Sequence, residues 1–122
     1  MAVALVLSAA AAQPAHAGDA QRGADIVRSR STGLCVLCHA LPGVPAVHAG
    51  TLGPDLAGVG ARYSRAGLRE RLVAPERFNP DSMMPSVTRT QGLQRVASAR
   101  AGQPLLDAGQ LEDVLSYLET LR

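Results

Sequence analysis

The chain has 122 residues, which is enough for one small domain, and its formal net charge is +2. It contains two Tyr, one Phe and no Trp, so few large side chains are present to build a core. The basic residues are all Arg, and no basic run or basic–aromatic alternation indicates nucleic-acid binding.

The N-terminus has the pattern of a secretory signal peptide. Residues 1–17, MAVALVLSAAAAQPAHA, contain no Asp, Glu, Lys or Arg and end in the small-x-small pattern Ala15-His16-Ala17. The apolar run is shorter than the roughly 20 residues that span a bilayer, and no other stretch could span one. We therefore predict a cleaved signal peptide over residues 1–17 and one domain over residues 18–122; a frayed apolar tail or anchor remnant is the alternative.

Two helices are predicted in the first two thirds of the domain. Asp19 can cap a helix over residues 20–30. Ser64 can cap a second helix over residues 65–74, which Pro75 ends.

The last segment has the clearest helical pattern. Asp107 and Gln110 resemble a capping box. Apolar residues then recur at helical spacing, with Tyr117 beside them: Leu111, Val114, Leu115, Leu118 and Leu121. No stretch shows convincing strand alternation, so the predicted fold class is all-α.

Long irregular stretches separate these helices, over residues 40–60 and 75–104. Loops of this length normally count against an assignment in a small domain, but they are reasonable when they wrap a bound group. Together with the shortage of large side chains, they favour a large apolar cofactor at the centre of the domain.

The motif CVLCH provides the attachment chemistry for such a cofactor. Cys35 and Cys38 are the only cysteines, and His39 follows directly. Cys-x-x-Cys-His is the c-type haem attachment signature. Two thiols three residues apart on a helical turn can each form a thioether with one haem vinyl group, and the next residue points its imidazole at the iron. We predict one covalently bound haem c on Cys35 and Cys38, with His39 as an axial ligand.

Three other uses of such a motif fit the sequence less well. A thioredoxin-like dithiol needs a strand–helix context, which is missing. A zinc site built on these residues and His48 lacks the second cysteine pair that structural zinc usually uses. A disulfide between Cys35 and Cys38 would close only a tiny loop and would stabilise little.

The sixth iron ligand is predicted to be a methionine. His48 lies nine residues past His39 in a loop rich in Pro and Gly, so a surface position is the better interpretation. Met84 precedes Pro85, which favours an extended backbone that can project a thioether, and we prefer it to Met83. A filled sixth site predicts electron transfer, whereas an exchangeable one would indicate a haem sensor.

The outer ring nitrogen of His39 should donate a hydrogen bond that orients the ring. The loop TLGPDLAGVGARY offers carbonyl acceptors, and Pro54 is the preferred one because it sits in a rigid turn. An ordinary turn at Gly53-Pro54-Asp55 is the alternative.

Five segments together resemble class I cytochromes c. They are GDAQRG, CVLCH, LGPDLAGVGARY, the Met-Pro pair and LEDVLSYLETLR, and they span nearly all of residues 18–122. The resemblance implies a class I cytochrome c-like fold in which the N- and C-terminal helices cross near Gly23 and Tyr117. It also implies axial ligation by His39 and Met84.

A narrower resemblance is to the SoxX family, the small monohaem subunits of SoxAX cytochrome complexes in bacterial sulfur oxidation. Two stretches carry it, RLVAPERFNPDSMMPS and RTQGLQRV. The resemblance implies a periplasmic, non-catalytic electron-accepting subunit of an L-cysteine S-thiosulfotransferase-type complex. Its implied partners are a SoxA-type cytochrome subunit, a SoxYZ-type carrier protein and a downstream cytochrome.

Val87 and Thr88 replace the aromatic residues that this resemblance leads us to expect after Met-Pro-Ser, and Ser98-Ala99-Arg100 lacks a bulky apolar residue. We expect these positions near the haem edge or a partner face. The alternative function is a free-standing soluble cytochrome c that carries electrons to a terminal oxidase or reductase.

Overall fold

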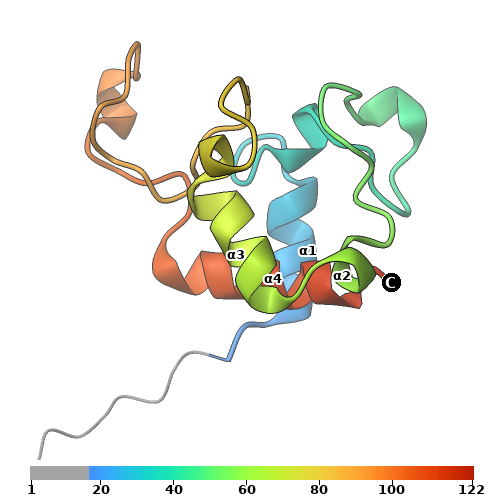
Figure 1. Ribbon diagram of the computed structural model, residues 1–122. Coiled ribbons are helices and arrows are strands. Elements are labelled where there is room, and N and C mark those ends of the chain that lie inside the picture. The colour runs from blue at the N-terminus through green and yellow to red at the C-terminus, as the bar shows by residue number, and fades with distance from the viewer. Residues whose placement is uncertain (1–16) are drawn as a thin grey trace, which may run out of the picture.

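The computed structural model describes residues 17–122, which form helices and loops without a β-strand (Figure 1). The α-helices are α1 (Ala20–Arg28), α2 (Val59–Arg62), α3 (Arg65–Val73) and α4 (Ala108–Thr120). Single turns of 3-10 helix interrupt the loops: η1 (Cys35–Leu37), η2 (Ala46–His48), η3 (Pro75–Arg77) and η4 (Ser98–Arg100). The predicted all-α class is confirmed, whereas residues 1–16 of the predicted signal peptide lie outside the described part.

The predicted caps begin α1 and α3. The Asp19 carboxylate accepts a hydrogen bond from the Arg22 backbone N–H at 2.8 Å. The Ser64 hydroxyl accepts one from the Gly67 backbone N–H at 3.2 Å. Each bond satisfies an N–H group that has no partner within its own helix, so both helices begin where the sequence predicts.

A complete capping box begins α4. The Gln110 backbone N–H donates to Asp107 Oδ1 at 2.8 Å, and the Asp107 backbone N–H donates to Gln110 Oε1 at 3.0 Å. The predicted apolar stripe is buried, and Leu115 and Val114 are fully enclosed. This helix therefore supplies the largest part of the core.

Helices α1 and α4 cross at Gly23, as the resemblance to class I cytochromes c implies. A Cβ atom on Gly23 would lie against the Asp113 carbonyl and 2.8 Å from Tyr117 Cβ. Only a glycine allows the two backbones to approach this closely. An ion pair closes the crossing, because Arg22 Nε lies 2.9 Å from Oδ2 of the buried Asp113.

Helix α3 packs beside α4 through Leu68 and Leu72, which are both buried. Val87 is also buried, at 3% exposure, and its backbone N–H donates to the Leu72 carbonyl at 2.9 Å. Of the two places expected for Val87, a partner face is excluded, because its side chain is buried in the core; a position near the haem edge stays a prediction. Within residues 17–122, no helix is both long and apolar enough to span a bilayer.

Candidate functional site

The Cys-x-x-Cys-His motif forms one tight turn after α1. Leu34 precedes it in the left-handed region at φ 63°, and Cys35 then begins η1. The backbone N–H groups of Cys38 and His39 both donate to the Cys35 carbonyl, at 3.1 and 3.0 Å. Residues three apart on such a turn share a face, so the two thiols lie on the same side of it.

The imidazole of His39 is held by the Pro54 carbonyl. His39 Nδ1 lies 2.6 Å from the Pro54 carbonyl oxygen. A carbonyl can only accept a hydrogen bond, so Nδ1 carries the hydrogen in this contact. Nε2 then keeps its lone pair, which is the form of histidine that binds a metal ion.

The loop that carries Pro54 is attached to the motif along its length. Backbone N–H groups of the loop donate to carbonyls of the motif in three places: Gly50 to Val36 at 2.9 Å, Gly53 to Cys38 at 2.7 Å and Leu56 to Ala40 at 3.0 Å. These bonds fix the loop relative to the thiols, so the position of Pro54 follows from the same contacts that shape the motif.

Gly53 lies directly against the ring of His39. A Cβ atom built on Gly53 would be 2.7 Å from Nδ1 and 2.8 Å from Nε2 of the imidazole. Real Cβ atoms do not approach neighbours this closely, so the ring fits only because position 53 has no side chain. This role of Gly53 was not predicted from the sequence, in which its place next to the predicted hydrogen-bond acceptor Pro54 is the available signal.

The environment of the thiols disfavours a redox dithiol. Both cysteines are free and half-buried. Burial raises the pKa of Cys35 to about 11, so its thiol is protonated at neutral pH. Redox-active cysteines instead have lowered pKa values that favour the thiolate.

The methionines differ clearly in exposure. Met83 is 77% exposed, whereas Met84 is half-buried and packs against the hydrophobic core. The Met84 backbone N–H also donates to the Ser82 hydroxyl at 3.2 Å. Of the two, Met84 is therefore the one held in a defined position.

His48 is exposed at the end of η2. Among residues 17–122, no group of three or more His, Cys, Asp or Glu side chains is arranged to hold a metal ion. The zinc alternative therefore lacks a ligand set.

The residues around the motif fit a haem group. The donor set consists of two thiols on one turn, an imidazole with Nε2 available and a half-buried thioether on a second loop. The two loops stand on the same side of the helix crossing (Figure 1). Large apolar side chains on these loops are exposed: Leu37, Val47, Leu52, Phe78 and Met83. A flat apolar cofactor would cover surface of this kind.

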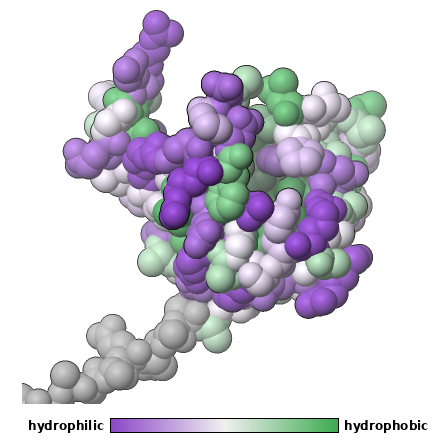
Figure 2. All heavy atoms as spheres, in the orientation of Figure 1, coloured by the Kyte–Doolittle hydropathy of each residue, from purple (hydrophilic) through white to green (hydrophobic). Residues whose placement is uncertain are grey.

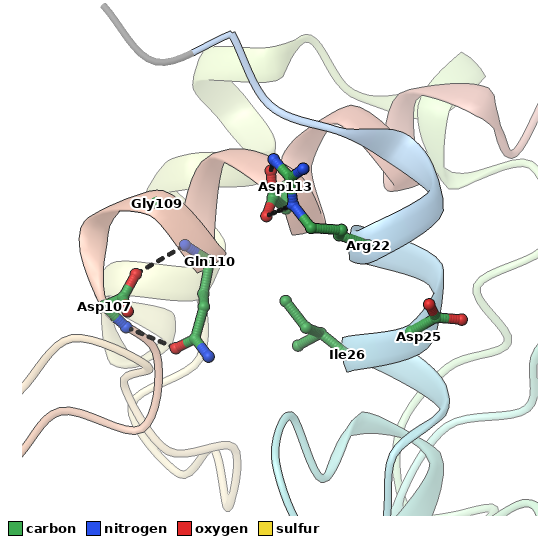
Figure 3. Close-up of a pocket in the computed structure, with 7 residues that line it drawn as sticks. All are labelled: Arg22, Asp25, Ile26, Asp107, Gly109, Gln110 and Asp113. Atoms are coloured by element: carbon green, nitrogen blue, oxygen red, sulfur yellow. Dashed lines mark hydrogen bonds and ion pairs between the residues drawn. The ribbon is translucent and has the colours of Figure 1, made fainter.

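The hollow drawn in Figure 3 is separate from this site. It lies between α1 and the start of α4, and Arg22, Asp113 and Gln110 line it. Of its charged residues, Arg22 and Asp113 are engaged in the helix-crossing ion pair and Asp107 is engaged in the capping box. None of the CVLCH residues lines it, so this hollow belongs to the packing of the helices.

Comparison with known proteins supports the interpretation of the motif. The family model for cytochrome c matches residues 20–122. The crystal structure of SoxXA from P. pantotrophus is similar to this chain, with 31% sequence identity and a TM-score of 0.75. That match covers 85% of this chain and 82% of the other. No curated protein sequence matches.

The helix crossing, the Cys-x-x-Cys-His turn and the match over residues 20–122 agree, and we conclude that this chain belongs to the cytochrome c family.

Proposed function

We propose that this chain is a periplasmic monohaem cytochrome that acts as the electron-accepting subunit of a SoxAX-type complex. The observation that carries this proposal is the likeness to SoxXA, which covers more than four fifths of both chains at 31% identity. The stretches RLVAPERFNPDSMMPS and RTQGLQRV support it as well, because they carry the narrower resemblance to the SoxX family.

In this proposal, Cys35 and Cys38 would hold one haem c through two thioether bonds, and His39 and Met84 would bind its iron. When bound, the haem supplies a centre that accepts and donates single electrons. The Pro54 carbonyl keeps the hydrogen of His39 on Nδ1, which leaves Nε2 for the iron. A thioether ligand from Met84 would keep oxygen and substrates from the iron.

The complex as a whole would join thiosulfate to a cysteine thiol of a SoxYZ-type carrier. A sulfur–sulfur bond forms, the thiol loses its proton, and two electrons are released. The SoxA-type subunit would receive these electrons first. This chain would accept them one at a time and pass them to a downstream cytochrome, without catalytic residues of its own.

The test is to recover the tagged holoprotein from its native periplasm and identify what accompanies it. A second haem-bearing subunit in the eluate, and reduction of the haem by thiosulfate only when that subunit and the carrier protein are present, would support the proposal. A lone monomer that stays oxidised with thiosulfate and both partners, and that reduces a terminal oxidase when pre-reduced, would select the free-standing carrier instead.

A further inference from the structure

A long loop between α3 and α4 forms a lobe that projects from the rest of the molecule (Figure 1, orange). We define this lobe as residues 88–105. Its base is closed where the Leu106 backbone N–H donates to the Val87 carbonyl at 2.9 Å. Val87 and Leu106 are both buried, with 3% and 1% exposure. The lobe therefore leaves and re-enters the core at one point, as an Ω-loop does.

The outer part of the lobe is open to solvent. Every residue from 91 to 103 is exposed. Leu93 is 45% exposed and Val96 is 41% exposed. The hydrogen bonds of η4 join only its own residues and their neighbours, as in the bond from the Arg100 backbone N–H to the Ala97 carbonyl at 2.8 Å. Burying these apolar side chains against another surface would be favourable.

The charge of the lobe has a single sign. Residues 82–106 contain three Arg and no Asp, Glu or Lys. Arg89 is in an ion pair with Glu76 at the base. Arg95 and Arg100 are in no ion pair with any residue of the described chain. Their positive charge is therefore available to an external partner.

Three arginines of the neighbouring segment 62–77 are engaged with other side chains of this chain. Arg65 and Arg69 both pair with Glu112 on α4. The Arg71 guanidinium lies between two aromatic rings, 3.8 Å from the centroid of Tyr63 and 4.1 Å from that of Phe78. These cations already have partners, so this segment is less suited to recruit an acidic protein than the lobe is.

We propose that the lobe is a docking element for a protein partner that presents carboxylates around an apolar patch. Leu93 and Val96 would be buried in the contact, and Arg95 and Arg100 would pair with the carboxylates at its edge. The identity of the partner rests on the proposed function, in which it is the second haem-bearing subunit. Single-signed charge at the edge of an interface chiefly accelerates association and makes it dependent on salt.

Other kinds of binding partner fit the lobe less well. Lipid surfaces are usually recognised by clusters of four to eight basic residues or by aromatic anchors. Residues 88–105 contain no Trp, Tyr or Phe and only three basic residues. A symmetric contact between two copies of the lobe would bring like charges together.

The experiment compares holoprotein variants for binding to the second subunit, purified from the same periplasm. Arg95→Glu with Arg100→Glu tests the charges, and Leu93→Ser with Val96→Ser tests the apolar contact. Arg77→Glu with Arg122→Glu gives the same change in net charge elsewhere on the exposed surface, and Ala66→Ser makes an exposed apolar position outside the lobe polar. The haem spectrum and the melting temperature monitor folding of each variant.

We expect each lobe variant to weaken binding about tenfold or more, and the charge variant to lose most of the salt dependence of association. The control variants should bind within about twofold of the wild type. Equal binding by lobe and control variants would overturn the lobe assignment while leaving the proposed function intact. A wild-type protein that binds no haem-bearing subunit would overturn the proposed function and the lobe's role with it.

Two further measurements test the other kinds of binding partner. Wild-type binding to phosphatidylglycerol vesicles that the charge variant loses would assign the lobe to a lipid surface. A wild-type dimer in size-exclusion chromatography that the lobe variants convert to a monomer would assign it to a second copy. Either result would overturn the proposal.

Discussion

At the scale of single residues, Gly53 lies against the His39 ring with no room for a side chain. The ring is held on one edge by the Pro54 carbonyl at 2.6 Å. A displaced ring would lose this hydrogen bond and the direction of Nε2 together. Position 53 therefore controls the orientation of the proposed iron ligand.

We expect Gly53→Ala to destabilise the holoprotein by about 1–3 kcal/mol, the usual cost of an added methyl group without space. The ferric visible spectrum should gain a high-spin component, because the His39–iron bond weakens. Gly109→Ala is the control, since a Cβ atom there meets only Asp107 Oδ1 at 3.4 Å. An unchanged spectrum and melting temperature in Gly53→Ala would contradict this role.

The two methionines give a matched pair of variants. Met84→Leu should convert the ferric haem to a high-spin form, because leucine fills a similar volume but cannot bind iron. Met83→Leu should leave the spectrum unchanged, since Met83 is 77% exposed. Visible absorption of both purified variants checks this, and a high-spin spectrum in Met83→Leu alone would reverse the assignment.

Some of the site could be predicted from the sequence. The carbonyl of Pro54 followed from the need of a ligand histidine for a hydrogen-bond acceptor and from the rigidity of an X-Pro turn. The contact of Gly53 with the ring could not be inferred, since it depends on how two loops meet. The backbone conformation of Leu34 could not be inferred either, because a leucine rarely adopts the left-handed φ of 63° that it has here.

At the scale of elements, the crossing of α1 and α4 depends on the absence of a side chain at position 23. A larger residue there would force the helices apart, because the Asp113 carbonyl and Tyr117 Cβ occupy the space. We expect Gly23→Ala to reduce the free energy of unfolding by about 3 kcal/mol. Chemical denaturation measures this free energy. A loss smaller than that caused by an Ala substitution at an exposed position would contradict the close crossing.

The ion pairs between α3 and α4 predict a dependence of stability on pH. Arg65 and then Arg69 hold the pKa of Glu112 below its usual value of 4.5. The folded state thus favours the charged carboxylate, so the contribution is complete above about pH 4.5 and is lost as the pH falls through the lowered pKa.

We expect Glu112→Gln to remove part of this acid sensitivity. Because these side chains are partly exposed and screened by water, the effect should be about 1 kcal/mol at pH 7 and should be smaller at pH 3. Denaturation curves at the two pH values check the difference. An equal loss of stability at both would show that the carboxylate charge is not the cause.

The longer helices were predictable because local signals specify them: a cap, an apolar period and a terminating proline. Helix α2 was not expected, since its four residues carry no such pattern. It forms where the Gly60 backbone N–H donates to the Leu121 carbonyl at 2.8 Å, a contact between distant segments. The burial of Val87 is likewise tertiary, because it depends on Leu72 and Leu106.

At the scale of the whole molecule, polar and apolar surface alternate over the visible face of the domain (Figure 2). The helix crossing forms a base, and the loops with the motif and with Met84 rise on one side of it (Figure 1). This arrangement explains how the domain can form a core with so few aromatic residues. The helices are joined by close contacts at glycines, and the loops would pack against the haem.

Intact mass spectrometry of the purified native protein, before and after extraction with acidified acetone, tests the central claim most directly. The account predicts the mass of one haem added to the chain, retained after extraction, with Cys35 and Cys38 both resistant to alkylation. A colourless protein, or one whose haem is extracted to leave two alkylated thiols, would contradict it.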